Sequence, residues 1–170
     1  MALKEKALKR LCGRLNKAGI PYLLTGAWML SARGFEDAWH GFDVAVPGSC
    51  AEKADEVLTK LGMRTPVRET ERSCEIHYHF DGADITLHGG YELPGDIRFE
   101  PPFAMDTTVV LGEEVPLMTL EDAFALSLLT GQEKEVERLR TCLLTRPFRL
   151  SHLTQALAAP GILAQVPQQA

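Results

Sequence analysis

The sequence predicts an α/β (α+β) fold, in which helices flank a small mixed β-sheet and the C-terminal third is helical. Apolar residues recur at helical spacing near the N-terminus, alternate with polar residues through the middle, and return to helical spacing near the end. The chain has 170 residues, 45% of them hydrophobic, which suffices for one domain with a core. We expect an α/β core over 1–118, a helical part over 119–158 packed on the same domain, and a loose tail over 159–170.

Composition narrows the classes of partner. The net charge of −5 and the pI near 5.5 argue against a nucleic-acid partner, because contact with that backbone requires clustered Lys and Arg. The cysteines form no CxxC pair, which predicts reduced thiols in a cytoplasmic protein and not a disulfide framework. No apolar run approaches the roughly 20 residues of a membrane span, and the N-terminus lacks the apolar core of a signal peptide.

The first half of the chain alternates helices with strands. Pro21 suits the first positions of a strand, and Gly34 and Gly62 are typical residues after the end of a helix. Ser49 and Glu52 form the pattern of a capping box at a helix N-terminus. In order, we expect an amphipathic helix ending near residue 19, a strand at 20–24, a helix at 27–32, a strand at 42–46 and a helix at 51–61.

The middle of the chain predicts hairpins, and the last third predicts helices. The segments 75–80 and 83–88 alternate in polarity around Asp81-Gly82, a strong two-residue turn signal. The stretch 89–102 is rich in Gly and Pro and is expected to be a long loop. A second hairpin should join 107–111 to 115–118. Thr119 then caps a helix over 120–130, and further helices are expected at 133–144 and from Ser151 onward.

The two-residue turn also fixes which side chains share a face. It places His79 opposite Asp84, which predicts one apolar face toward the core and one polar face. The polar face carries Glu75, His77, His79, Asp84, Thr86 and His88. This face is either a solvated sheet surface or a cleft bearing a metal or general acid–base groups.

Asp43 lies on the strand expected at 42–46, on the opposite side from its apolar neighbours. If that strand pairs beside the hairpin, Asp43 and Asp84 converge. Two converging carboxylates can hold a divalent ion against phosphate oxygens.

The order of these residues resembles the nucleotidyltransferase superfamily, and most of all its minimal members, which include antibiotic-modifying nucleotidyltransferases and AbiEii-type toxins. The resemblance covers roughly residues 5 to 145. The family pattern is a Gly-Gly or Gly-Ser turn, a short helix, Gly-x-x-Arg-x-Thr-x-Asp-x-Asp on the next strand, and a later strand Asp. Thr25-Gly26 matches the turn, Gly34 the next glycine, Asp43 the second acid and Asp84 the third.

The chain departs from the family pattern at positions that matter for the chemistry. Asp37 stands where Arg is usual, Trp39 where Thr is usual, and Gly41 where the first metal-binding Asp belongs. Glycine has no side chain to bind a metal, and an Asp in place of Arg adds negative charge where phosphate would bind. Both changes predict that two-metal catalysis is impaired.

The resemblance therefore implies a nucleotidyltransferase-fold protein that binds a nucleotide, another small ligand or a protein partner, as toxin–antitoxin pairs do, with impaired catalysis. One alternative is an active metal-dependent nucleotidyltransferase that moves NMP from NTP to a hydroxyl. The other is metal-dependent chemistry on the histidine-rich face, or a purely structural or interaction module. The candidate catalytic residues are Asp43 and Asp84; the candidate nucleotide-binding residues are Thr25, Gly26 and Trp39; the candidate ligands for Mg or Mn, with Zn as the alternative, are Asp43, Asp84 and His79.

Overall fold

The structure is a computed structural model that describes residues 2–35, 39–64, 75–93, 97–99 and 106–158. The chain divides into two compact units. The first comprises Met1–Tyr91 with Pro102–Met118, and the second comprises Glu92–Pro101 with Thr119–Ala170. Within the described ranges, no helix has the length and apolar character needed to cross a membrane.

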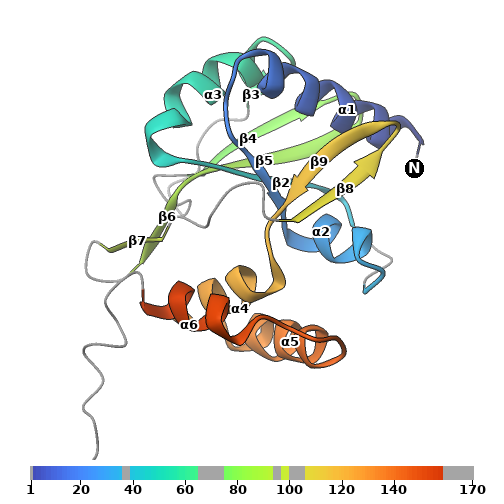
Figure 1. Ribbon diagram of the computed structural model, residues 1–170. Coiled ribbons are helices and arrows are strands. Elements are labelled where there is room, and N and C mark those ends of the chain that lie inside the picture. Colours follow the sequence, from blue (N-terminus) through green and yellow to red (C-terminus); the bar gives the residue numbers. More distant parts are fainter. Residues whose placement is uncertain (1, 36–38, 65–74, 94–96, 100–105, 159–170) are drawn as a thin grey trace, which may run out of the picture. The chain divides into compact units, whose positions relative to one another are not determined.

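A seven-stranded mixed sheet in the order β3-β4-β5-β2-β1-β9-β8 forms the centre of the first unit (Figure 1). The β2–β5 and β1–β9 pairs are parallel, and the remaining neighbours are antiparallel. The strands are β1 (Leu23–Thr25), β2 (Gly41–Val46), β3 (Met63–Arg64), β4 (Glu75–Phe80), β5 (Ala83–Gly89), β8 (Asp106–Val110) and β9 (Glu113–Leu117).

Helices cover the apolar face of this sheet. The helices α1 (Ala2–Lys17) and α3 (Ala51–Thr59) lie side by side over it in Figure 1, and α2 (Gly26–Ala32) follows directly from β1. The hydroxyl of Tyr78 on β4 donates a hydrogen bond to Asp55 on α3, which ties that helix to the sheet. The fully buried large side chains of this unit include Leu8, Leu11, Leu15, Phe42, Tyr78, Ile85 and Leu87.

The β4–β5 hairpin has the predicted register. His79 pairs with Asp84, and Glu75 pairs with His88. The turn residues Asp81 and Gly82 both have positive φ, 49° and 75°, as a type I′ turn requires. The apolar residues of both strands face the core and the polar ones face away, so the sequence prediction of two distinct faces is confirmed.

Two predictions about the flanking elements are wrong. The strand expected at 20–24 spans Leu23–Thr25 instead: the backbone N–H of Ile20 still donates to Leu15 of α1, and residues 20–22 belong to no strand. The capping box does not form: a 3-10 turn at Gly48–Cys50 precedes α3 and places Cys50, not Ser49, at the N-cap, with no side-chain cap.

Within the stretch expected to be a loop at 89–102, the structure has the strands β6 (Tyr91–Leu93) and β7 (Ile97–Phe99), which pair as a two-stranded sheet. Each strand has only three residues and lies among Gly and Pro, so the sequence shows no alternation of polarity there. Residues 94–96 and 100–102 lie outside the described part of the chain.

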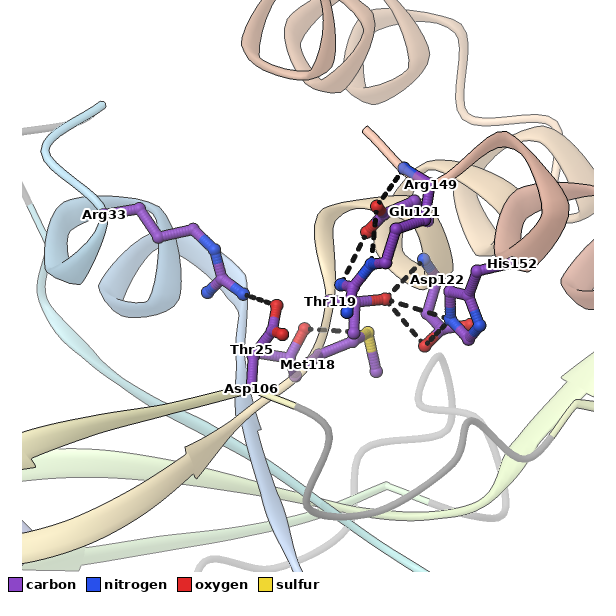
Figure 2. A network of polar contacts seen from close by, with 9 residues as sticks. All are labelled: Thr25, Arg33, Asp106, Met118, Thr119, Glu121, Asp122, Arg149 and His152. Atoms are coloured by element: carbon purple, nitrogen blue, oxygen red, sulfur yellow. Dashed lines mark hydrogen bonds and ion pairs between the residues drawn. The ribbon is translucent and has the colours of Figure 1, made fainter. Parts of the chain in front are cut away.

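The second unit contains the helices α4 (Leu120–Leu129), α5 (Glu133–Leu144) and α6 (Leu150–Ala158), with α4 packed against the other two. The Thr119 hydroxyl accepts a hydrogen bond from the backbone N–H of Asp122 at 3.0 Å, which confirms the predicted cap. Figure 2 shows how the first turn of α4 is held: Asp122 contacts His152 at 2.9 Å, and Glu121 accepts hydrogen bonds from Arg149.

Candidate functional site

The pairing of β2 with β5 brings the two candidate aspartates to the same face of the sheet. In this parallel register Gly41 pairs with Asp84 and Asp43 pairs with Thr86. Side chains two residues apart on a strand point to the same side, so Asp43 and Asp84 lie on one face, on neighbouring strands.

Both aspartates line one pocket of about 270 Å³. The convergence that the sequence predicted on condition of this pairing is therefore present in the structure. The lining residues come from the start of α2, the segment before β2, and the strands β2 and β5: Ala27, His40, Gly41, Phe42, Asp43, Asp84 and Thr86.

The turn into α2 comes very close to the Asp43 carboxylate. Gly26 has a φ of +71°, and a Cβ added there would lie 2.3 Å from Oδ2 of Asp43. The left-handed backbone conformation favours glycine at this position, and an added Cβ would displace the Asp43 carboxylate. Beside it, the Thr25 hydroxyl contacts the Met118 sulfur at 3.5 Å (Figure 2), so we expect the backbone of this turn, more than the Thr25 side chain, to meet a ligand.

No side chain fits at position 41. A Cβ added to Gly41 would lie 2.3 Å from the backbone carbonyl oxygen of Asp84, its pairing partner on β5. Real Cβ atoms do not come this close to backbone, so a larger residue would push β2 and β5 apart. The position that the resemblance assigns to the first metal-binding acid is thus closed by the sheet itself.

Each aspartate has one carboxylate oxygen in contact with a histidine. His88 Nε2 lies 3.1 Å from Oδ1 of Asp43, and His79 Nδ1 lies 2.7 Å from Oδ1 of Asp84. The third histidine of this face, His77, has its Nδ1 3.2 Å from the Thr86 hydroxyl.

The two carboxylates of this pocket suit a cation whose remaining ligands are phosphate oxygens. In the described ranges, no three His, Cys, Asp or Glu side chains come together in a way that could hold a metal ion, so His79 does not complete a three-ligand set with Asp43 and Asp84. Mg²⁺ is nevertheless commonly bound through one or two carboxylates together with substrate phosphates, and does not require a cage of protein ligands alone.

Comparison with solved structures decides the fold. TM1012 from Thermotoga maritima, assigned as a nucleotidyltransferase, superposes with a TM-score of 0.56 at 18% identity over 83% of this chain and 92% of that one. The chain has a nucleotidyltransferase-like fold. The antibiotic-resistance factor ANT(2'')-Ia superposes with a TM-score of 0.59 at 13% identity, over 95% of this chain and 92% of that one.

The lincosamide antibiotic adenylyltransferase LnuA, in its lincomycin-bound structure, also has this nucleotidyltransferase-like fold, with a TM-score of 0.52 at 12% identity over 80% of this chain and 96% of that one. ANT(2'')-Ia has in addition been seen in complex with adenylyl-2''-tobramycin. No protein-family model and no curated protein sequence matches the chain.

Trp39, a predicted nucleotide-binding residue, does not line the aspartate pocket. It lines a second hollow of about 310 Å³ together with Trp28 and Leu111 among others. Its ring packs on Phe42 at 5.1 Å, and the Lys4 ammonium lies 5.5 Å from its centre. The structure therefore brings Gly26 next to Asp43, which shares a pocket with Asp84, and leaves Trp39 on a separate hollow.

Sequence reasoning gave His88 no individual role. The residue was expected only as one member of the polar face, yet its ring contacts Asp43 and also lies 3.8 Å from Oε1 of Glu75 through Nδ1. The signal that could have found it is the register, since Ala45 pairs with His88 and Asp43 is two residues away on the same strand face.

Proposed function

We propose that this chain binds a nucleoside triphosphate together with one divalent cation, Mg or Mn, and that it transfers the nucleotidyl group inefficiently or not at all. The observation that carries the proposal is the pairing of Gly41 with Asp84. This pairing keeps two carboxylates in one pocket and closes the position of a third. The likeness in fold to nucleotidyltransferases supports the ligand class.

Asp43 and Asp84 would hold the cation. The chemistry that a cation supplies at such a site is neutralisation of charge on phosphate oxygens. Without it, two carboxylates in one pocket of a protein with a net charge of −5 would repel a triphosphate. We therefore expect nucleotide binding to require the metal, and metal binding to be much tighter with the nucleotide present.

Gly26 would allow the backbone at the start of α2 to approach the triphosphate closely. Its missing side chain leaves the backbone beside Asp43 uncovered, and its left-handed conformation gives the turn its shape. Among the described residues that line the pocket, His40 is the one with a basic side chain.

Catalysis is expected to be impaired because nucleotidyl transfer by two metal ions stabilises both the attacking and the leaving oxygens. Two carboxylates, each with one oxygen already in contact with a histidine, supply ligands for one ion more readily than for two. A single ion can bind the triphosphate without activating an acceptor hydroxyl.

A thermal screen tests the binding proposal directly. ATP, CTP, GTP and UTP are each added with Mg²⁺, with Mn²⁺ or with EDTA, and the melting temperature is measured. We expect at least one nucleotide to raise the melting temperature with metal and not with EDTA. At a nucleotide concentration of 100 times Kd, binding stabilises the folded state by about 2.7 kcal/mol. Asp43→Asn and Asp84→Asn should abolish the shift, whereas Glu114→Gln, an exposed acid on β9, should retain it.

The other outcomes separate the alternatives. A shift with nucleotide in EDTA would contradict the role of the cation. A shift with Zn²⁺ alone that His79→Ala removes would support metal chemistry on the histidine-rich face and contradict the proposal. Turnover of an α-labelled nucleotide at an ordinary enzymatic rate, about 1 s⁻¹ or faster, would contradict the impairment.

A further inference from the structure

The two histidine–aspartate contacts of this pocket differ strongly in burial. The side chain of His88 is 14% exposed and that of Asp43 is 38% exposed, whereas those of His79 and Asp84 are 60% and 77% exposed. An exposed pair of this kind contributes little, because water competes for both partners. The His88–Asp43 contact is the one that water competes for least.

The ring of His88 is held from several sides. Its Nε2 contacts Asp43 at 3.1 Å, and its Nδ1 lies 3.8 Å from Glu75 on β4. The ring also stacks on the buried Tyr91, with centroids 5.3 Å apart and an interplanar angle of 26°. A ring fixed in this way fixes the carboxylate that it contacts.

We infer that His88 is the positioning residue for Asp43, an inference that rests on the proposed function. By donating from Nε2 to Oδ1 of Asp43, it holds the carboxylate in one orientation and leaves Oδ2, the oxygen nearest Gly26, for the cation. Partners of this kind orient metal-binding groups, and their loss typically weakens metal affinity by about 10- to 100-fold.

The same contacts predict how much each histidine of this face contributes to cation binding. His88 should matter most for cation binding, because its contact with Asp43 is the better shielded of the two. His79 should matter less, because its contact with Asp84 is open to water. His77 serves as the matched control, since it lies on the same face and its Nδ1 contacts the Thr86 hydroxyl.

The test is a titration of Mn²⁺ followed by electron paramagnetic resonance, with the nucleotide that gives the largest thermal shift held at saturation. We expect His88→Ala to weaken Mn²⁺ binding about 10- to 100-fold. His88→Gln should remain within about 3-fold of wild type, because its amide N–H can donate to Asp43 as the ring does. His77→Ala should remain within about 2-fold of wild type.

Three results would overturn the inference: unchanged binding in His88→Ala, equal losses in His88→Ala and His88→Gln, or a larger loss in His79→Ala than in His88→Ala. Wild-type protein that binds no Mn²⁺ with any nucleotide would overturn the proposed function, and the inference with it. If His88→Ala does not fold, His88→Phe keeps an aromatic ring beside Tyr91 but has no donor for Asp43, and it should weaken Mn²⁺ binding about 10- to 100-fold, with wild-type affinity contradicting the inference.

Discussion

A single residue, Gly41, limits the number of carboxylates in the proposed cation site. The resemblance to nucleotidyltransferases points to aspartate at this position, but the parallel pairing of β2 with β5 puts the Asp84 carbonyl oxygen where a Cβ would lie. The absence of an acid is therefore built into the packing of the two strands, and one substitution cannot undo it without moving the backbone.

We predict that Gly41→Asp destabilises the protein by about 1–3 kcal/mol, the usual range for overpacking, and does not produce transfer activity. The control is Gly13→Ala, at an exposed position in α1 with no atom within 4 Å of the added Cβ, which should stabilise by about 0.5–1 kcal/mol. Urea unfolding of the three proteins measures both changes. A Gly41→Asp protein of wild-type stability that gains transfer activity would show that position 41 is open.

At the scale of secondary-structure elements, the start of α4 depends on a buried carboxylate. Glu121 is 4% exposed, and it accepts hydrogen bonds from the backbone N–H and the guanidinium of Arg149, just before α6 (Figure 2). Burial alone would raise the pKa of Glu121, but the hydrogen bonds and charge of Arg149 outweigh it and lower the pKa to about 2. The charged form is therefore favoured by folding.

Because the folded pKa of Glu121 lies below its ordinary value of 4.5, its contribution to stability is complete above about pH 4.5 and is lost as the pH falls toward 2. We predict that Glu121→Gln costs about 1–3 kcal/mol at pH 7 and that its difference from wild type shrinks between pH 4.5 and 2. Urea unfolding of both proteins between pH 7 and pH 2 measures this difference in stability. Glu137→Gln, in an exposed pair with Arg140, should cost less than about 0.5 kcal/mol, and a Glu121→Gln cost that does not change with pH would contradict the account.

How far the sequence predicts this fold depends on how local each contact is. The β4–β5 register follows from one turn, Asp81-Gly82, so every pair in it could be predicted. The pairing of β2 with β5 joins strands about 40 residues apart and has no local signal, so the convergence of Asp43 with Asp84 could be predicted only conditionally. The contact between His88 and Asp43 spans 45 residues and depends on the same pairing, which is why its role was missed.

At the scale of the whole molecule, the residues of the proposed site all belong to the unit formed by Met1–Tyr91 and Pro102–Met118. The solved structures with the same fold match 80–95% of the chain, so the likeness extends well beyond this pocket. The net charge of −5 makes an unassisted triphosphate an unfavourable ligand. The proposed cation, shared between the aspartates and the phosphates, would let an acidic protein bind a triphosphate.

The stoichiometry of Mn²⁺ bound in the presence of saturating nucleotide tests the central claim most directly. Electron paramagnetic resonance measures the free Mn²⁺ as protein is added, and the bound Mn²⁺ follows by difference. The Asp43→Asn variant, which should lack the cation site, gives the background. A single cation site predicts one bound ion per chain above that background. Two ions per chain would contradict it, because they would mean that the pocket assembles a complete two-metal centre despite Gly41.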